Sequence, residues 1–478
     1  MLQDHDQTLR LHEWAGISIH NWDSERRARL VHTVTAWKNA NRLNVAPLSL
    51  GGDGNSLQAR QFVGVVEAAD AAIEIYPKLD AGLLDDATSF SENRVRSVMH
   101  NLLWMLEVTE HHDIAETETA GLEETPDTFV DLFAFLLAKR LLRELENGVA
   151  HTYQRMEDDL RAVRGRIQIL DQVTRNWNRL DRMACAWDEF TSDTLLNRLF
   201  KCACRFLHQR VGHTKTSGLL ADCLALLEDV ADVPVEVALF EIQFLRWDRS
   251  NERFRLAFNL ARRLMEGTGH ALGAGEADTF VFLLDMNAVF EDYAHAVLEK
   301  YFDTGVETQK FLGRLFNLSK GGINQYADYY WEGIETTWIG DAKYKHLTKG
   351  RQDSLKFAEA VDDTKDEEQG EELSTATNQA AGRLITPSDV RQLTVYAELE
   401  KKRNPSKAEP SLMLLYPFVG SGRFEADSTT TWNGSTFWLM PVRVDVQRDL
   451  REALPAPSSH SPLAEMNLNR DLSHLFDG

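Results

Sequence analysis

The sequence is poor in cysteine and has no long apolar segment. Its four cysteines form no CxxC pair: Cys185, Cys202, Cys204 and Cys223. Because Cys202 and Cys204 stand two positions apart on a predicted helix, they point to different faces, so we expect buried reduced thiols and no zinc site. No apolar run approaches the roughly 18 residues of a membrane span, and the polar N-terminus lacks a signal-peptide pattern. We therefore expect a cytoplasmic protein that does not cross a membrane.

Basic residues are outnumbered, with 52 Lys and Arg against 74 Asp and Glu and a formal net charge of −22. Contacts to phosphates supply most non-specific affinity for DNA, so a chain this acidic is not expected to grip DNA unaided. Positive charge is concentrated in residues 343–351 and 401–407. Either these stretches hold DNA or another subunit does; the alternative is a pair of solvated basic loops. No nucleotide-binding loop of the GxxxxGK(S/T) kind is present, which predicts that the chain is not itself a nucleotide hydrolase.

The length of 478 residues exceeds one ordinary core, and 43% hydrophobic with 26% charged residues is typical of a soluble globular protein. We predict an α+β multidomain fold. Its expected parts are a β-rich N-terminal domain with an inserted helix (1–90), a mainly helical middle region (91–270), a C-terminal α/β domain (271–450) and a tail (451–478). The acidic stretch 358–381 is poor in aromatic residues and is expected to be a mobile insertion.

The inserted helix is predicted over residues 23–41, starting at an Asp or Ser cap. It carries four basic residues: Arg26, Arg27, Arg29 and Lys38. Such a helix is either an element that projects from the small β domain or a scaffold helix with a solvated basic face.

The stretch from Gln325 to Lys345 carries the clearest chemistry. Residues 326–331 and 336–343 are rich in aromatic and β-branched residues and are separated by a Glu-Gly turn, which predicts a β-hairpin. Asp328 then lies on the first strand, while Asp341 and Lys343 share one face of the second.

Two converging carboxylates repel each other and bind a hard divalent cation such as Mg²⁺, which prefers oxygen ligands. Such a metal polarises a phosphodiester and activates water, and an adjacent ammonium can orient that water or offset charge on the phosphate. This arrangement resembles that of PD-(D/E)xK nucleases, with Asp328 and Asp341 as catalytic metal ligands and Lys343 as the catalytic lysine. The alternative is structural: a strand-end residue, a turn cap after Gly340 and a solvated strand lysine.

The residues around the hairpin favour the nuclease interpretation. A helix is predicted over 388–402 with Ser388 as its N-cap, and Gln392 and Tyr396 lie one turn apart on one face, where they can support the site. An apolar strand follows at 412–416, which completes the order hairpin, helix, strand. Glu291, on a helix before the hairpin, is a possible third site residue or a surface acid.

Several stretches together resemble the McrC subunits of McrBC-type, modification-dependent (type IV) restriction systems. They occur in the family's order across roughly residues 9–445: Val63-Gly64, Ile73 to Lys78, Arg164 to Ile167, Asp188 to Phe190, Asp193-Thr194, Asn197-Arg198, Asp285 to Asn287, Phe290-Glu291, Asp341 to Lys345, Ser388-Asp389, Gln392, Tyr396 and Leu415 to Pro417. The ordered set is far more specific than any one of its members. One departure is Ala327, which stands where the family usually has proline before the first acid.

The resemblance implies that residues 271–450 form a PD-(D/E)xK endonuclease that uses Mg²⁺ to cut double-stranded, methylated DNA. It also implies that the N-terminal domain docks on an AAA+ GTPase hexamer of the McrB kind and stimulates it, with the basic helix (Arg26, Arg27, Arg29, Lys38) as the element that enters the ring. Lys345, Lys349 and Arg351, just after the motif, are the predicted DNA contacts. The alternative is a non-catalytic adaptor that activates the GTPase and has a degenerate nuclease fold.

Overall fold

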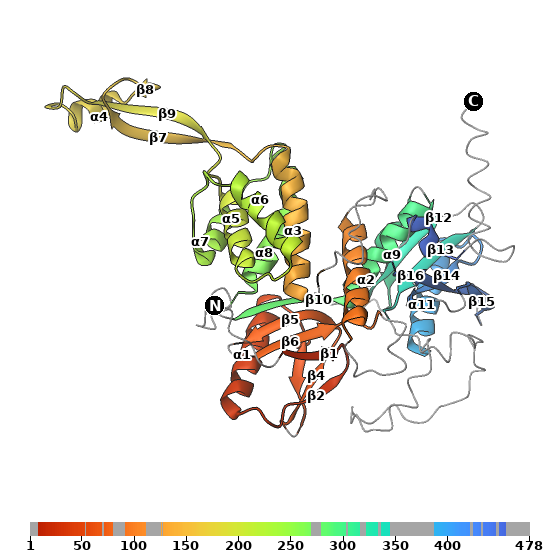
Figure 1. Cartoon of the computed structure of the whole chain (residues 1–478). Helices are drawn as coiled ribbons and strands as arrows, with labels where there is room; N and C mark the ends of the chain where they lie inside the picture. Colours follow the sequence, from red (N-terminus) through yellow and green to blue (C-terminus); the bar gives the residue numbers. More distant parts are fainter. Residues whose placement is uncertain are drawn as a thin grey trace.

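The computed structural model describes residues 8–455 apart from 13 short or longer gaps: 53, 69–70, 80–90, 111–125, 127, 269–278, 303–304, 316–321, 333–335, 345–386, 421–423, 432–433 and 446–448. Figure 1 shows an N-terminal sheet, a helical body that carries an extended arm, and a C-terminal sheet. None of the described helices is long and apolar enough to span a membrane. The predicted insertion 358–381, and the tail beyond residue 455, lie outside the described residues.

The N-terminal body is built on one four-stranded sheet and one three-stranded sheet. The larger has the order β1 (Thr8–His12), β6 (Ala71–Tyr76), β5 (Phe62–Ala68) and β10 (Phe280–Asp285); the smaller has the order β2 (Gly16–Ser18), β4 (Ser56–Ala59) and β3 (Leu48–Leu50). Strand β10 pairs antiparallel with β5 and forms the edge of this sheet opposite β1. The predicted boundary at residue 271 is therefore wrong for this strand, because its apolar side chains complete the N-terminal sheet.

Helix α1 (Ser24–Ala40) is the predicted inserted helix. Asp23 caps it by accepting the backbone N–H of Arg26 at 2.7 Å. Leu30, Val34 and Trp37 recur at helical spacing and are buried in one cluster with the apolar residues of the larger sheet. The helix therefore packs on the sheet: the scaffold alternative is confirmed, and the prediction of a projecting helix is wrong.

The middle region is helical, as predicted, at its centre. It comprises α3 (Phe129–Glu146), α5 (Leu195–His208), α6 (Thr214–Leu226), α7 (Val235–Glu241), η2 (Ile242–Phe244), η3 (Glu252–Phe254) and α8 (Arg255–Glu266). Helix α2 (Glu92–Glu110) instead packs along α9 (Met286–Phe302), which belongs to the C-terminal body. One large buried cluster runs through all three bodies and includes Cys204 and Cys223, which are free thiols.

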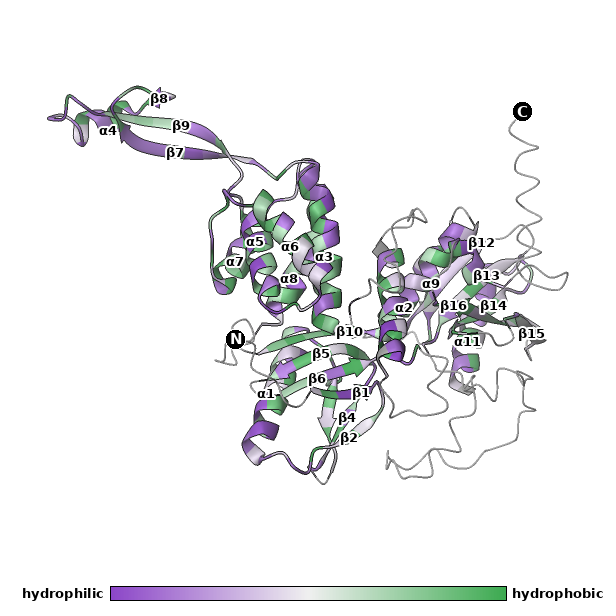
Figure 2. Ribbon diagram, in the orientation of Figure 1, coloured by the Kyte–Doolittle hydropathy of each residue, from purple (hydrophilic) through white to green (hydrophobic). Residues whose placement is uncertain are grey.

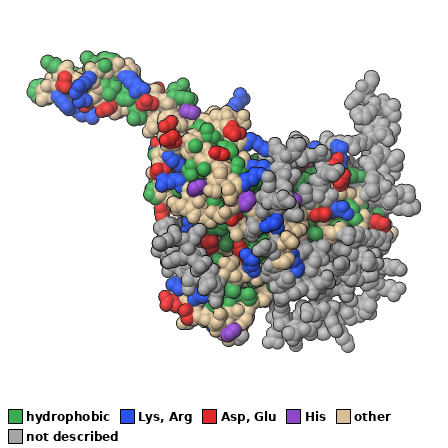
Figure 3. All heavy atoms as spheres, in the orientation of Figure 1, with side chains coloured by type: hydrophobic (Ala, Val, Ile, Leu, Met, Phe, Trp, Pro, Cys, Tyr) green, Lys and Arg blue, Asp and Glu red, His purple; other side chains and the backbone are tan. Residues whose placement is uncertain are grey.

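An arm extends from this helical body (Figures 1 and 3). Its strands are β7 (Thr152–Leu160), β9 (Met183–Thr191) and the short β8 (Arg166–Ile167), and α4 (Ile169–Thr174) lies near its tip. The prediction of a mainly helical middle region misses this element, because β7 is hydrophilic along most of its length and exposes seven successive residues (Figure 2). A strand without a buried face has no alternation of apolar and polar residues to reveal it.

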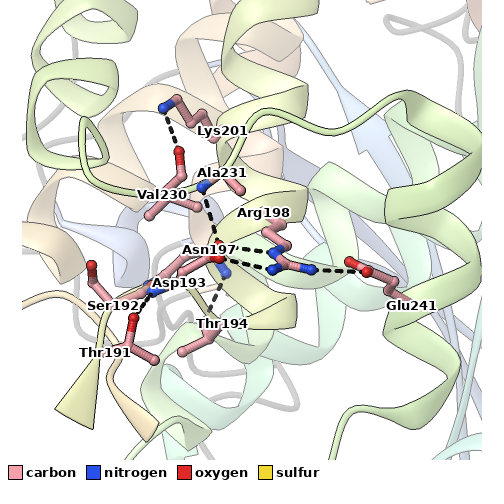
Figure 4. A network of polar contacts seen from close by, with 10 residues as sticks. All are labelled: Thr191, Ser192, Asp193, Thr194, Asn197, Arg198, Lys201, Val230, Ala231 and Glu241. Atoms are coloured by element: carbon pink, nitrogen blue, oxygen red, sulfur yellow. Dashed lines mark hydrogen bonds and ion pairs between the residues drawn. The ribbon is translucent and has the colours of Figure 1, made fainter. Parts of the chain in front are cut away.

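The base of the arm is fixed by a polar network (Figure 4). The fully buried Asn197 donates from Nδ2 to the carbonyls of Ala150 and Ser192, each at 2.7 Å, and so ties together the chain entering β7 and the chain leaving β9. Arg198 forms a bidentate pair with Asp193 at 2.7 and 2.8 Å. Asp193 is thus the salt-bridge partner of Arg198 at the point where the arm joins the body.

The C-terminal body is a six-stranded mixed sheet. Its order is β11 (Glu307–Arg314), β12 (Asn324–Glu332), β13 (Thr337–Ala342), β14 (Ser411–Phe418), β16 (Thr436–Arg443) and β15 (Asp427–Thr430). Helix α11 (Pro387–Arg403) packs on one face, and α9 packs on the other with the short η5 (Leu450–Ala453) against it. Strands β12 and β13 form the predicted antiparallel hairpin, and β14 pairs parallel with β13. The predicted order hairpin, helix, strand is confirmed.

Candidate functional site

The two predicted acids meet where strands β12 and β13 lie side by side. Tyr329 pairs with Gly340 in the hairpin, which sets Asp328 opposite the end of β13. Oδ2 of Asp328 accepts the backbone N–H of Ala342 at 3.0 Å. This bond holds the first carboxylate against the strand that carries the second, Asp341, so the pairing of the strands brings the two acids together.

Asp341 is almost fully buried, with 1% of its surface exposed. Its Oδ2 lies 2.6 Å from Nζ of Lys343, and its Oδ1 accepts from Nε2 of Gln392 on α11 at 3.2 Å. Among the described residues none donates a well-aligned hydrogen bond to Oδ2, although the Lys343 ammonium and the Asp328 carboxyl both lie close to Asp341. The DxK spacing therefore places acid and lysine in direct contact on one face of the strand.

Burial and the neighbouring Asp328 raise the pKa of Asp341 to about 7. Burial works to lower the pKa of Lys343, but Asp341 outweighs it and leaves that pKa above its ordinary value. A buried acid with a raised pKa, next to a second carboxyl and a fixed ammonium, is a common feature of functional sites in proteins. A cation bound between them would lower the pKa of Asp341 again.

Helix α11 closes the site from one side. Nε2 of Gln392 also donates to the hydroxyl of Tyr396 at 2.7 Å, so the two residues form one face, as the sequence predicts. Burial raises the pKa of Tyr396, which keeps its hydroxyl protonated. The helix starts at Pro387, so Ser388 lies in its first turn, and the prediction of Ser388 as N-cap is wrong.

A residue that the sequence did not single out joins the site from β11. Gln309 has a φ of 49°, a left-handed value that is uncommon for a residue with a side chain. Its Nε2 donates to Oε1 of Glu291 at 2.6 Å and lies 3.4 Å from Oδ1 of Asp328. Glu291 on α9 is thus brought beside Asp328, and burial together with Asp328 raises its pKa. Strand β11 was not predicted, so no sequence pattern pointed to Gln309.

The donor set fits a hard cation of the Mg²⁺ kind. The described residues contain no ready-made group of three or more His, Cys, Asp or Glu side chains placed to hold a metal. They do contain the two carboxylates of Asp328 and Asp341, with Glu291 next to them. Mg²⁺ is usually held by one or two carboxylates and keeps several waters for the substrate's phosphate, so this pair is an adequate set.

The predicted partner-binding residues lie on α1, in the N-terminal body. On α1, Arg27 donates to the backbone carbonyls of Gly54 and Ile19, Arg26 lies 4.3 Å from the ring of Trp22, and Arg29 reaches Glu25 at 3.9 Å. These contacts bind the basic face to its own domain, and Lys38 follows in the last turn of the helix. The predicted DNA contacts Lys345, Lys349 and Arg351 lie outside the described residues.

The sequence and the fold both resemble known proteins. A family model described as McrBC 5-methylcytosine restriction system component matches residues 57–363, which include both site acids and Lys343. No curated protein matches the sequence. A chain of the refined half-complex from the tetradecameric assembly of Thermococcus gammatolerans McrB AAA+ hexamers with bound McrC has a TM-score of 0.62 at 16% identity, covering 98% of this chain and 100% of that one. A chain of the cryo-EM structure of the Thermococcus gammatolerans McrBC complex has a TM-score of 0.46 at 18% identity, covering 63% and 90%.

Proposed function

This chain belongs to the family of McrBC 5-methylcytosine restriction system components, and from that premise we propose that it is the DNA-cleaving subunit of its complex. The observation that carries the proposal is the contact between Asp341, Lys343 and Asp328 at the end of one hairpin. Those residue types are the acids and the lysine of a PD-(D/E)xK endonuclease. The substrate is double-stranded DNA that carries methylated cytosine.

Each residue of the acid site has a separate role in the proposed phosphodiester hydrolysis. Asp328 and Asp341 would hold Mg²⁺, and Glu291 would add a further carboxylate beside the first acid. The bound ion would polarise the phosphate and lower the pKa of the attacking water. Lys343 orients that water and offsets negative charge on the phosphate. Gln392 fixes the orientation of Asp341 from α11, so that its second oxygen stays directed at the lysine.

An AAA+ GTPase hexamer of the McrB kind is the proposed partner. The similar chain from Thermococcus gammatolerans comes from an assembly of McrB AAA+ hexamers with bound McrC. A subunit with a net charge of −22 benefits from a partner that supplies DNA affinity, and stimulation of GTP hydrolysis would link DNA recognition by the ring to cutting.

We place the contact with that partner on the arm. Large apolar side chains near its tip are strongly exposed: Ile169 75%, Leu170 77%, Val173 64%, Trp177 73% and Leu180 95%. Clustered exposed apolar groups of this kind mark protein interaction surfaces. Helix α1, in contrast, uses its apolar face on its own sheet, and its three arginines make contacts within the domain.

A second candidate function is a non-catalytic GTPase activator. Ala327 stands where the first acid is usually preceded by proline, and it is fully buried in the core under α11. In that case the arm would still stimulate the partner, while the acids would be remnants of a lost site.

Cleavage of methylated plasmid by wild-type chain and by Asp341→Ala, each with the partner, GTP and Mg²⁺, separates the two functions. We expect wild type to cut only when Mg²⁺ is present, and Asp341→Ala to be inactive while GTP hydrolysis is still stimulated. Cutting by Asp341→Ala would contradict the site. Stimulated GTP hydrolysis without cutting by the wild type would support the activator alone.

A further inference from the structure

The end of strand β13 is tied to the N-terminal body through Tyr344. This residue follows Lys343 directly and stands two positions after the end of β13. Its hydroxyl donates to Oε1 of Glu13 at 2.7 Å. The two residues are 331 positions apart in the sequence, so this bond joins the first strand region of the chain to the DxK motif.

Glu13 is a firm anchor for this bond. It is fully buried, and its backbone N–H donates to the carbonyl of Tyr76 at 3.0 Å, which continues the pairing of β1 with β6. The same Oε1 that receives the Tyr344 hydroxyl also accepts the backbone N–H of Lys78 at 2.8 Å. The carboxylate is therefore held at its backbone and at its side chain before Tyr344 reaches it.

The ring of Tyr344 also contacts α9, the helix that carries Glu291. Its ring packs against that of Phe290 on α9, with centroids 6.1 Å apart, and Phe290 precedes Glu291. The backbone N–H of Lys343 donates to the carbonyl of Leu415 on β14 at 2.9 Å. The main chain at Lys343 is thus fixed on one side by the neighbouring strand and on the other by the Tyr344 side chain.

We infer that Glu13 and Tyr344 are positioning residues for the nuclease site, through which the N-terminal body holds Lys343 beside Asp341. The inference rests on the proposed function. It means that the cutting site is completed across the boundary between two bodies, so that the N-terminal body contributes to cleavage directly. Lys343 has a long, flexible side chain, and the position of its backbone decides whether the ammonium meets the carboxylate and the scissile phosphate.

Tyr344→Phe is the direct test because it removes one hydroxyl and leaves the ring in place. A displacement of about 1 Å at a reacting group costs up to about 10²-fold in rate, so we expect kcat for plasmid cleavage to fall between about tenfold and 10²-fold. KM for DNA and the stimulation of GTP hydrolysis should stay within about twofold of wild type, since the substitution removes no charged side chain and lies outside the arm. Glu13→Gln keeps an oxygen acceptor and should retain most of the cleavage, whereas Glu13→Ala should resemble Tyr344→Phe.

Tyr330→Phe is the matched control. Tyr330 on β12 donates to the buried Glu400 on α11 at 3.1 Å within the C-terminal body, so the variant loses a comparable tyrosine–glutamate bond without touching the boundary between the bodies. If Tyr344→Phe cuts as fast as wild type, or loses no more cleavage than Tyr330→Phe at equal melting temperature, the positioning role is wrong.

Hydrogen exchange keeps the inference testable apart from cleavage. Peptides that cover residues 337–344 should exchange at least about tenfold faster in Tyr344→Phe than in wild type or Tyr330→Phe, because the anchor at the strand end is lost. Unchanged exchange would overturn the anchoring. If wild type fails to cut while exchange still responds, the proposed nuclease function fails and the anchor stands.

Discussion

The arm and the acid site depart in opposite ways from the usual pattern, in which large apolar side chains are buried and carboxylates are exposed. Near the arm tip, Trp177 and Leu180 leave 73% and 95% of their surfaces exposed, although water is a poor environment for such side chains. In the site, Asp341 is 1% exposed, although burial of a carboxylate is costly. Neither arrangement stabilises the isolated chain. Under the proposed function, each is explained by what would bind there: a protein surface at the arm and a cation at the site.

The two regions also differ in how they are supported. The arm is a two-stranded ribbon, with the short β8 added, and Asn197 and the Arg198 pair tie its base into the body. The acid site lies in a six-stranded sheet between α9 and α11, with hydrogen bonds to its acids from three different elements. A docking surface can lie at the end of a long arm, whereas catalysis requires groups held within fractions of an ångström. We therefore expect changes at the two regions to separate cleanly.

The largest effect is expected at the arm. Trp177→Ala and Leu180→Asp should each lower stimulation of the partner's GTP hydrolysis by at least tenfold, because loss of a buried interface anchor typically costs 2 kcal/mol or more of binding. Cleavage should fall with it. Titration of the partner with each variant, read out as GTP hydrolysis, measures the effect.

Phe240→Ala is the control for the arm, since Phe240 is 60% exposed but lies on α7 of the helical body. It should stimulate GTP hydrolysis as wild type does. Full stimulation by Leu180→Asp would show that the exposed tip is not the docking surface. The arm would then no longer differ from the acid site in the way proposed.

The site was more predictable than the arm, and the reason is physical. Strands β12 and β13 combine aromatic and β-branched residues with a turn signal, so the local sequence determines both the strands and their hairpin. Strand β7 (TYQRMEDDL) buries no face and gives no such signal. Strand β10 is apolar on both faces and fits either sheet equally well, because its partner β5 lies more than 200 positions away in the sequence. The contact of Gln309 with the site acids depends on its left-handed backbone conformation within a strand, which the sequence does not reveal.

A smaller effect is expected from Gln309. Its amide bridges Glu291 and Asp328, so its loss leaves two like charges without a shared donor, and they should move apart. Gln309→Ala should raise the Mg²⁺ concentration for half-maximal cleavage by about tenfold, the size usual for a residue that orients metal ligands. Mg²⁺ titrations of cleavage check this.

Gln325→Ala on the neighbouring strand is the matched variant for that experiment. The amide of Gln325 donates to the backbone carbonyl of Asn324, and within the described part of the chain no hydrogen bond joins it to a site acid. We expect it to leave the Mg²⁺ requirement unchanged. Equal Mg²⁺ curves for Gln309→Ala and wild type would mean that the bridge has no part in holding the acids.

The smallest expected effect concerns stability and pH in the absence of metal. The pKa of Asp341 rises from an ordinary value of 3.8 to about 7 in the folded chain, chiefly through burial. The folded state therefore binds this proton more tightly than the unfolded state, and its stability should decrease as the pH rises from about 4 to about 7. Asp341→Asn removes the titration, so its melting temperature should fall less over this window. Melting curves in EDTA measure both slopes, and equal slopes would contradict the burial of a repelled carboxyl.

The most direct measurement follows GTP hydrolysis and cleavage of methylated plasmid in the same reaction, with the partner and Mg²⁺, for wild type, Asp341→Asn and Leu180→Asp. The account predicts that Asp341→Asn stimulates GTP hydrolysis fully and cuts no DNA, while Leu180→Asp loses both activities. Cleavage by Asp341→Asn, or cleavage and GTP hydrolysis that fall together in it as they do in Leu180→Asp, would contradict the separation of docking arm and cutting site.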